Sequence, residues 1–507
     1  MQIPLATWLA IVCCSAVTFA QQYYYFPPSR YISYADGRTE ILSPAPVIRN
    51  LARIDDRRSR YTADPAGSAS KLSASKSISS RLGGASSQST IAPRNDAQLS
   101  RAVVDLALSI GRGSTDENSA VEVFSPASIM GIINLLLLGA DGITRTELMS
   151  AMKQGDRTTV SSYHSRAAAL MNNLLANKPQ ELEQLAWKTE SCSSNDYPDS
   201  EEPIDIASKS KDLRIANGIF AQSQLPLRDK FVSLSNQLYG ATTQNVNFRD
   251  SLASASQINK WVNQATNGKI REVTNGQFSP DTLMTIASTL YFKASWMTEF
   301  LAKSTKPRKF YPDGSARPAI KVDMMLLSGC LPYHFERSLG LRMVGLPYSD
   351  NATTMYVLMP QNSTRAKLRS LQNQLTAAGL DSMISKMKMR STSLQFPRMQ
   401  LESSTNLEKS FRRLGIKSIF SPQHSNLRLM LDQSVQGRLP LFVSQIQHKV
   451  NLSVDERGTE GAAVTMTLVD KAGPAVVFNA NEPFLIYVRH DPTRLPLFYG
   501  AVFDPRG

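Results

Sequence analysis

Through residues 96–507, apolar side chains recur at spacings that predict regular secondary structure. The helical period over residues 97–110 gives one apolar face, formed by Leu99, Val103, Leu106 and Ile110. Further elements are predicted at residues 129–138 (a buried helix), 257–266 (a helix), and 283–292, 343–347 and 355–360 (buried strands). No linker or internal repeat divides this region, so we expect one large domain.

The first 20 residues follow a different pattern, because they carry no charge and contain an apolar stretch from Leu5 to Phe19. Small side chains at Thr18 and Ala20 have the spacing that a signal peptidase recognises. The alternative, a buried N-terminal helix, is disfavoured by the polar residues that follow. We therefore predict a cleaved secretory signal in residues 1–20 and a secreted, extracellular protein.

Residues 21–95 are predominantly polar. Within them, residues 68–90 contain ten serines in 23 positions and almost no large apolar side chain. Such a stretch buries too little apolar area to offset the entropy lost on ordering. We predict a disordered extension.

A second polar segment interrupts the globular pattern at residues 178–211. Its acidic residues are Glu181, Glu183, Glu190, Asp196, Asp199, Glu201, Glu202 and Asp205. The few apolar side chains lie mostly in its first half. We predict an exposed acidic insertion that follows a helix.

The composition is typical of a globular chain, and its net charge indicates which classes of partner to consider. The 507 residues are 42% apolar and 19% charged, and the formal net charge is +14. Part of this excess lies in residues 21–95, which hold eleven basic and five acidic residues. The basic cluster there is Arg53, Arg57, Arg58 and Arg60, and it predicts polyanion contact, a processing site or a plain solvated tail. No apolar run reaches about 18 residues, so no transmembrane helix is predicted.

Cleavage of the predicted signal would remove Cys13 and Cys14, so the mature chain would keep two cysteines. Cys192 and Cys330 either form one disulfide or stay as two free thiols, and the sequence leaves both open. The acceptor pattern for N-glycosylation occurs at three positions: Asn351, Asn362 and Asn451. The first two lie in turn-like sequence, whereas the third lies in an alternating strand and is a poorer acceptor.

Enzyme signatures are missing from the sequence. The histidines are His164, His334, His424, His448 and His490, and none has the His-Glu-x-x-His spacing of a zinc site. The chain also lacks the Gly-x-Ser-x-Gly elbow and the phosphate-binding loop. We therefore predict no enzyme, no cofactor and no metal site.

The segment near the C-terminus carries the most information. Residues 450–454 alternate as a half-buried strand, and residues 458–465 that follow are small or β-branched with one charge, Glu460. Such a segment meets little steric resistance when it joins a sheet as an extra strand. Taken alone, the segment is better explained as an ordinary flexible loop between two strands.

Five motifs in order along residues 96–507 resemble those of the serpin family. They are FSPASI at 124–129 with LGA at 138–140 and Thr144, INKWV at 258–262 with TNGKI at 266–270, YFKASW at 291–296, ERGTEGAA at 456–463, and FNANEPFL at 478–485 with LFYG at 497–500. The resemblance implies an α+β fold of three β-sheets and eight to nine helices, with an exposed reactive loop at about 456–477.

The resemblance also implies a mechanism and its residues. A serine protease attacks the loop, forms an acyl-enzyme and is trapped when the cleaved loop inserts into the large sheet. The implied hinge is Glu456, Gly458, Thr459, Gly461, Ala462 and Ala463, and the implied sheet-opening region is Ser125, Ser128, Trp296 and His448. Val121 and Ser288 replace asparagines that the family usually has in this region, so polar pairing there is expected to differ.

Family loops place the cleaved bond near Lys471. The pair Lys471–Ala472 suits the acidic pocket of a trypsin-like protease, and Ala472–Gly473, the second choice, suits an elastase-like one. The alternative for Lys471 is a solubilising charge.

The functional prediction is a monomeric, extracellular inhibitor of trypsin-like serine proteases in a proteolytic cascade, with no nucleic-acid or membrane partner. The rival prediction is a non-inhibitory serpin that serves as a carrier, chaperone or structural protein. The hinge composition favours inhibition.

Overall fold

The computed structural model describes most of the chain from residue 96 onward. The described residues are 96–113, 116–155, 158–176, 185–192, 211–435, 441–457 and 474–507, together with the antiparallel pair β1 (Tyr31–Ser33) and β2 (Thr39–Ile41). This pair, which the sequence pattern did not predict, belongs to a separate compact unit, Met1–Leu82, and the larger unit is Gly83–Gly507. The predicted signal and the basic cluster of the extension lie outside the described residues.

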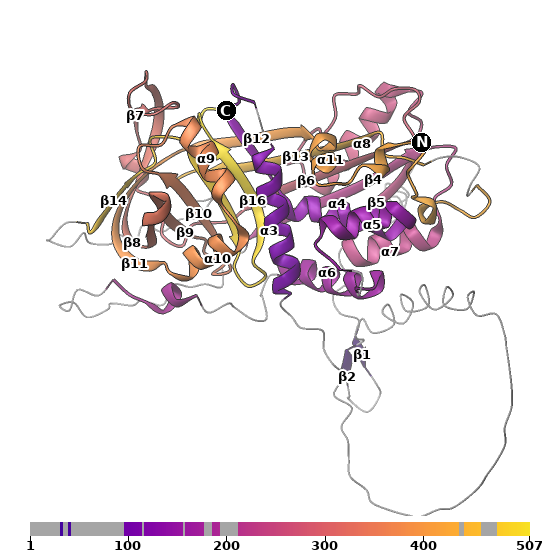
Figure 1. Cartoon of the computed structure of the whole chain (residues 1–507), viewed down its shortest axis with the longest axis horizontal. Coiled ribbons are helices and arrows are strands. Elements are labelled where there is room, and N and C mark those ends of the chain that lie inside the picture. The colour runs from indigo at the N-terminus through magenta and orange to yellow at the C-terminus, as the bar shows by residue number, and fades with distance from the viewer. Residues whose placement is uncertain are drawn as a thin grey trace, which may run out of the picture. The chain divides into compact units, whose positions relative to one another are not determined.

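One of the two sheets in the larger unit has five strands in the order β12-β13-β6-β4-β5 (Figure 1). Their bounds are β12 (Met399–Asn406), β13 (Gln445–Val454), β6 (Met284–Lys293), β4 (Asp212–Gln222) and β5 (Thr242–Val246). Every second residue of β13 is buried, as its alternating sequence predicts. Nearly all of β6 is buried, in agreement with its continuous apolar run.

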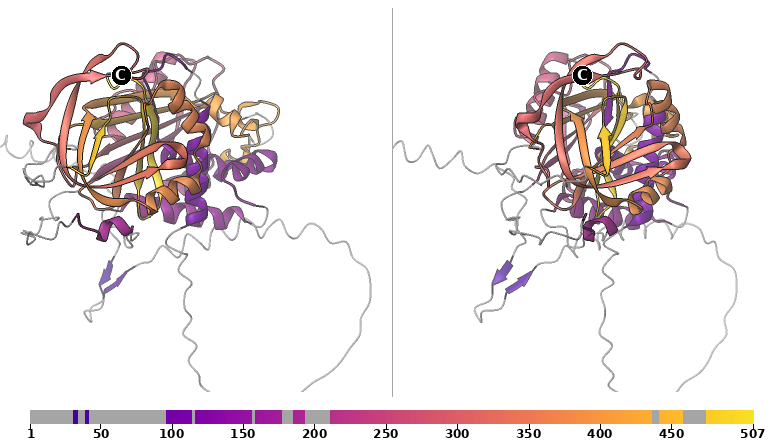
Figure 2. Two further views of the ribbon diagram at one scale, coloured as in Figure 1. Left: turned by 60° about the vertical axis from the view of Figure 1, so that its left-hand side comes forward. Right: turned by 90° about the vertical axis from the view of Figure 1, so that its left-hand side faces the viewer.

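The second sheet has nine strands and is strongly curved (Figure 2). In order they are β14 (Val476–Asn479), β11 (Lys388–Pro397), β8 (Ile320–Glu336), β9 (Leu341–Pro347), β10 (Thr353–Pro360), β15 (Phe484–His490), β16 (Leu495–Val502) and β3 (Val121–Phe124), and β7 (Lys306–Phe310) pairs with β8 off this path. The long strand β8 pairs with β7 and β11 through its first part and with β9 through its last residues. It therefore joins β7 and β11 to β9 and the strands beyond it in one continuous sheet.

Nine α-helices occur within the described residues, in agreement with the predicted eight to nine. They are α3 (Ala97–Arg112), α4 (Pro126–Gly139), α5 (Gly142–Ala151), α6 (Val160–Leu175), α7 (Asp229–Tyr239), α8 (Ser251–Ala265), α9 (Arg365–Gln374), α10 (Ala377–Ser385) and α11 (Glu408–Arg413). The predicted helices at 97–110, 129–138 and 257–266 are confirmed as α3, α4 and α8. None of the described helices is long and apolar enough to cross a membrane.

Helix α4 lies at the centre of the domain. It begins with Pro126 after Ser125, whose side-chain oxygen accepts a hydrogen bond from the backbone N–H of Ser128 at 3.1 Å. The helix packs against β16 of the nine-stranded sheet and against β4 and β6 of the five-stranded sheet. Because it contacts both sheets, it is buried on almost every side, which explains why nearly all of its side chains are apolar.

The acidic insertion differs from its prediction in the part that the structure describes. Residues 185–192 are not simply exposed, since Leu185 and Trp187 are buried in the domain. Glu190 accepts a hydrogen bond from Lys388 on β11, and Cys192 forms a disulfide with Cys330 on β8, with Cα atoms 5.9 Å apart. The apolar side chains in the first half of the segment dock it, while residues 178–184 and 193–210 lie outside the described residues.

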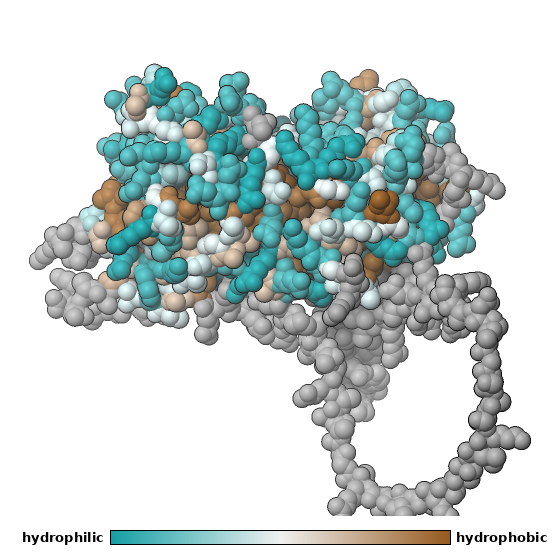
Figure 3. All heavy atoms as spheres, viewed as in Figure 1, coloured by the Kyte–Doolittle hydropathy of each residue, from teal (hydrophilic) through white to brown (hydrophobic). Residues whose placement is uncertain are grey.

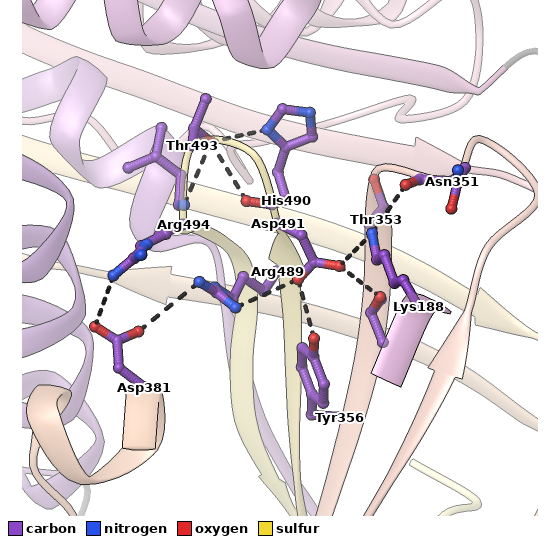
Figure 4. Close-up of polar contacts among 12 residues, drawn as sticks. Lys188, Asn351, Thr353, Tyr356, Asp381, Arg489, His490, Asp491, Thr493 and Arg494 are labelled. Atoms are coloured by element: carbon purple, nitrogen blue, oxygen red, sulfur yellow. Dashed lines mark hydrogen bonds and ion pairs between the residues drawn. The ribbon is translucent and has the colours of Figure 1, made fainter. Parts of the chain in front are cut away.

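A buried polar network also holds this docked segment (Figure 4). Lys188 lies 3.1 Å from the carboxylate of Asp491, at the turn between β15 and β16, and donates to the backbone oxygen of Asn351 at 2.9 Å. Asp491 is fully buried and accepts from Tyr356 at 3.0 Å and Thr354 at 2.8 Å. One carboxylate, in the turn between β15 and β16, thus joins the insertion to β10 of the nine-stranded sheet.

Candidate functional site

The candidate site lies where β13 of the five-stranded sheet leads into the predicted reactive loop. Strand β13 runs parallel to its neighbour β6, with His448 opposite Ser288 and Leu452 opposite Phe292. On the outer sides, β12 is antiparallel to β13 and β4 is antiparallel to β6. A strand that continued β13 after a reversal would run antiparallel to both β13 and β6. The junction between these two strands can therefore accept such a strand with good pairing on both edges.

The end of β13 is fastened to the segment that follows β6. The indole N–H of Trp296 donates to the backbone oxygen of Asp455 at 2.9 Å, and the Trp296 backbone N–H donates to Arg457 at 3.2 Å. The Phe300 backbone N–H donates to the oxygen of Glu456 at 2.8 Å. Trp296 is itself fixed by stacking on Tyr348, with ring centroids 4.3 Å apart. These contacts define where the sheet ends and the loop begins.

Glu456, the first predicted hinge residue, is buried and paired. Its carboxylate accepts from the Thr305 hydroxyl at 2.5 Å and forms an ion pair with Arg398, the residue between β11 and β12. Burial works to raise the pKa of Glu456, but the hydrogen bonds from Arg398 and Thr305 outweigh it and hold the pKa below its ordinary value. The glutamate therefore stays charged and is held in place at the start of the predicted hinge.

The remaining loop positions lie outside the described residues. These are Gly458, Thr459, Gly461, Ala462 and Ala463 of the hinge, and Lys471, Ala472 and Gly473 of the predicted reactive bonds. The chain is described again from Pro474 and enters β14, which runs parallel to β11 in the nine-stranded sheet. The two ends of the loop are thus held in two different sheets.

Beneath the β13–β6 junction, the structure brings together three predicted sheet-opening residues. The backbone N–H of Ser125 donates to Nε2 of His448 at 3.0 Å, and Ser125 also caps α4 at Ser128. Burial lowers the pKa of His448 to about 4, opposed by a backbone hydrogen bond at Ser288. The ring is therefore neutral at pH 7, with Nε2 as an acceptor.

Several polar side chains around this contact have no hydrogen-bond partner within the described part of the chain. Beside this contact they are the hydroxyls of Ser128 and Ser288 and the side-chain oxygen of Asn217. The hydroxyls of Thr285 and Thr289 also have no partner there, but they point to the opposite face of β6, because side chains alternate along a strand. Asn217 lies on β4 opposite Ser288. Unpaired polar groups weaken the packing beneath the junction, because each has given up water without a replacement. The replacement of a longer amide by Ser288 agrees with this loss of pairing.

Two of the predicted residues lie elsewhere. Trp296 is at the loop end of the junction, where it contacts Asp455. Asp455 is seven residues beyond His448, or about 23 Å along the strand. Val121 is at the start of β3, where it pairs with Val502 of β16. Sequence reasoning missed Arg398, Thr305 and Asn217, because only tertiary folding brings each of them to the site.

A pH prediction follows from the buried histidines. Burial lowers the pKa values of His164 to about 3, of His448 to about 4 and of His490 well below its ordinary value. Below about pH 6.5 the unfolded chain takes up protons that the folded chain does not, so stability falls as the pH drops toward 4. For His448 alone the loss between pH 7 and pH 5 is on the order of 2 kcal/mol.

Urea unfolding at pH 7 and pH 5 checks this expectation. A His448→Gln variant keeps an acceptor for Ser125 and should lose less stability on acidification, by about 2 kcal/mol. The control variant is His424→Gln, which replaces an exposed histidine by the same residue. Equal pH dependence in wild type and His448→Gln would show that His448 is not the neutral, buried group described above.

The three glycosylation patterns occupy different surroundings. Asn351 and Asn362 both adopt positive φ, 52° and 50°, in the turns that flank β10, and Asn362 is exposed. Asn451 lies within β13, and its side-chain oxygen accepts from Gln400 of β12 at 2.7 Å. No cluster of three potential metal-ligating side chains occurs among the described residues.

Comparison with known proteins agrees with this architecture. A family model described as Serpin (serine protease inhibitor) matches residues 101–505. Serine protease inhibitor 28Dc of Drosophila melanogaster is 33% identical over 417 residues, covering 76% of each chain. Serpin A3-5 of Bos taurus is 30% identical over 385 residues, covering 76% of this chain and 83% of its own. The chain belongs to the serpin family.

Solved structures show the same fold. Human kallistatin superimposes with a TM-score of 0.66 at 24% identity, covering 81% of this chain and 98% of its own. Human thyroxine-binding globulin, solved in complex with thyroxine, superimposes with a TM-score of 0.66 at 20% identity, covering 81% of this chain and 99% of its own. A serpin of Manduca sexta, serpin-12, superimposes with a TM-score of 0.63 at 22% identity, covering 80% of this chain and 98% of its own. The predicted serpin α+β fold is confirmed.

Proposed function

We propose that this serpin is a secreted inhibitor of trypsin-like serine proteases that traps its target by loop insertion. The observation that carries the proposal is the parallel β13–β6 pair, because β13 leads directly into the loop and its junction with β6 can accept an antiparallel strand. The hinge sequence supports it. Thr459, Gly461 and Ala463 are small and uncharged at alternate positions, which suits entry into a dry sheet interior.

The reactive bond in this proposal joins Lys471 to Ala472. The protease serine oxygen attacks the Lys471 carbonyl carbon, an ester to the enzyme forms, and the peptide bond breaks with a proton passing to the new amino terminus at Ala472. Water would normally hydrolyse the ester. Insertion of the freed loop removes the ester from its catalytic surroundings before that step, so inhibition depends on relative rates.

The experiment is incubation with trypsin-like and elastase-like proteases, followed by denaturing electrophoresis. A complex that resists denaturation, together with a rise in thermal stability after loop cleavage, is the expected result. N-terminal sequencing of the released fragment identifies the bond. Clean cleavage without any complex, and without a gain in thermal stability, would mean that the protein is not an inhibitor.

Lys471→Ala tests the choice of bond. The charge of Lys471 is expected to pair with the acidic pocket of a trypsin-like enzyme, and its loss should slow complex formation by about a hundredfold or more, since a charged pair buried in such a pocket contributes about 3 kcal/mol. Substitution of the neighbouring Thr467 by Ala is the matched control. An unchanged rate for Lys471→Ala would move the bond to Ala472–Gly473.

Secretion and glycosylation complete the proposal. The uncharged, apolar start of the sequence supports export, and the disulfide between Cys192 and Cys330 supports an oxidising compartment. Asn351 and Asn362 are the proposed acceptors, since both lie in turns. Asn451 is the weaker acceptor, because its amide is engaged between two strands. A proteolytic cascade is the proposed setting, with the basic extension as the proposed contact for polyanions.

A non-inhibitory carrier is the second candidate function. It is favoured by the likeness in fold to thyroxine-binding globulin, which at 20% identity concerns the fold alone. The electrophoresis experiment separates the two, because a carrier would be cleaved without forming the covalent complex.

A further inference from the structure

Strand β7 and the first residues of β8 form an antiparallel hairpin, residues 303–323, that concentrates positive charge. We call it the basic hairpin. Its basic residues are Lys303, Lys306, Arg308, Lys309, Arg317 and Lys321, and all six are exposed. In the space-filling view, hydrophilic side chains cover the region of β7 (Figure 3). This cluster lies within the folded domain and is distinct from the basic cluster of the extension.

The charges of the basic hairpin are not neutralised by their surroundings. None of its six basic residues forms an ion pair within the part of the chain that the structure describes. The two acidic residues of the segment face other cations instead: Asp313 lies 3.8 Å from Arg365, and Asp323 lies 3.9 Å from Arg398. The hairpin therefore presents an excess of positive charge to solvent.

Pairing within the hairpin brings like charges together. Lys309 lies directly opposite Lys321 across the two strands, and Arg308 lies opposite Val322. Like charges at directly opposed positions destabilise an antiparallel pair. Because side chains alternate along a strand, Lys306 and Arg308 face one side while Lys309 and Lys321 face the other. This arrangement does not stabilise the fold. It is typical of a surface that binds an anionic partner.

One end of β7 in the basic hairpin is fastened to the start of the predicted reactive loop, and the other end is fastened to the segment that follows β14. Thr305, which immediately precedes β7, donates its hydroxyl to Glu456 at the start of the loop. Tyr311, which immediately follows β7, donates its backbone N–H to the oxygen of Asn481, two residues beyond β14, at 2.9 Å. Figure 1 shows β7 and β14 on the same side of the domain. A protease that engages the loop is therefore brought close to these charges.

We propose that the basic hairpin is a second docking surface for the target protease, one that recognises an acidic surface on the enzyme outside its active site. The proposal rests on the inhibitory function proposed above. A protein surface fits better than a linear polyanion, because the charges occupy both faces of the hairpin instead of one continuous stripe. Exposed charges of this kind act mainly by steering association.

Anionic and cationic isoforms of trypsin are suitable probes, since they share a specificity pocket and differ in surface charge. At low ionic strength the wild-type protein should associate with the anionic isoform about tenfold faster than with the cationic one, and high salt should remove most of the difference. The variant Lys306→Glu/Lys309→Glu/Lys321→Glu should abolish or invert the preference. Its melting temperature should match wild type, because all three side chains are exposed.

The matched control reverses three exposed lysines elsewhere, as Lys260→Glu/Lys409→Glu/Lys417→Glu. Lys409 and Lys417 follow β12 at the end opposite to Arg398 and the hinge. This variant changes net charge by the same amount and should keep most of the preference for anionic trypsin. An equal loss in both variants would assign the effect to net charge and overturn the proposal.

A binding measurement that does not involve the loop separates this proposal from the inhibitory function. Anionic trypsin with its active site blocked by a small covalent inhibitor should bind immobilised wild type in low salt and should not bind the hairpin variant. If neither trypsin forms a covalent complex but this binding persists, the inhibitor proposal fails and the docking surface stands. If blocked trypsin does not bind, or if only heparin shows hairpin-dependent binding, the protease docking surface is refuted.

Discussion

Replacing Asp491 with asparagine is expected to lower the free energy of unfolding by about 3 kcal/mol, the largest stability effect of any single side chain discussed above. Asp491 is fully buried, and its carboxylate lies 3.1 Å from Lys188 and 3.4 Å from Arg489. Asparagine keeps the volume and removes the charge. Two cations that are themselves largely buried would then lose a counter-charge, which costs more than the lost hydrogen bonds alone.

The hydrogen bond from Tyr356 adds to the loss of stability expected for the replacement of Asp491 by asparagine. Burial, followed by the nearby charge of Asp491, raises the pKa of Tyr356 well above its ordinary value, so the phenol remains a proton donor. Its hydrogen bond to Asp491 is therefore a bond to a charged acceptor, and the amide oxygen of asparagine is a weaker one.

Urea unfolding measures the change, and two variants make it interpretable. Asp313→Asn removes an exposed carboxylate 3.8 Å from Arg365 and should change stability by less than about 0.5 kcal/mol. Lys188→Met combined with Asp491→Asn should cost less than the sum of the single changes, because the double variant leaves one fewer unpaired cation. A loss below about 1 kcal/mol for Asp491→Asn would contradict the network as described.

Thr459→Arg is expected to convert the proposed inhibitor into a substrate. The proposed insertion carries Thr459 into the interior of the five-stranded sheet, where an unpaired guanidinium costs several kcal/mol. A penalty of about 3 kcal/mol slows insertion roughly a hundredfold, whereas hydrolysis of the ester is unaffected. The protease would then be released before it is trapped.

The measurement is the yield of covalent complex against cleaved protein at equal protease. Complex should fall to about a tenth of the wild-type yield or less, with cleavage of the loop undiminished. Glu460→Arg is the control, since the neighbouring position alternates to the solvent side and should retain inhibition. Equal yields for Thr459→Arg and wild type would exclude insertion at this register.

The hinge Glu456 illustrates how far the sequence alone could go. Its position in the ERGTEGAA motif predicted that the loop begins there, and in the structure β13 ends two residues earlier, at Val454. Its partner Arg398 is 58 residues away along the chain. A single sequence contains no signal for that pairing, because ion-pair partners are selected by proximity in space.

The acidic insertion, residues 178–211, shows a case in which polarity alone gave an incomplete prediction. Its many carboxylates predicted exposure, yet Trp187 is 3% exposed and Lys188 reaches Asp491 across the fold. Average polarity of a segment conceals single apolar side chains that can dock it when a complementary surface is near. The pairing of Cys192 with Cys330 is of the same kind, since spacing in sequence left it open.

Local pattern determined the elements, the hinge composition and the family, because apolar periodicity and short motifs act over a few neighbouring residues. Only the tertiary structure decided that β13 lies parallel to β6, that Ser125 meets His448 beneath them, and that the basic hairpin is fastened to Glu456 and to the segment after β14. These relations join residues that are far apart along the chain, and burial and strand pairing in the folded domain fix them.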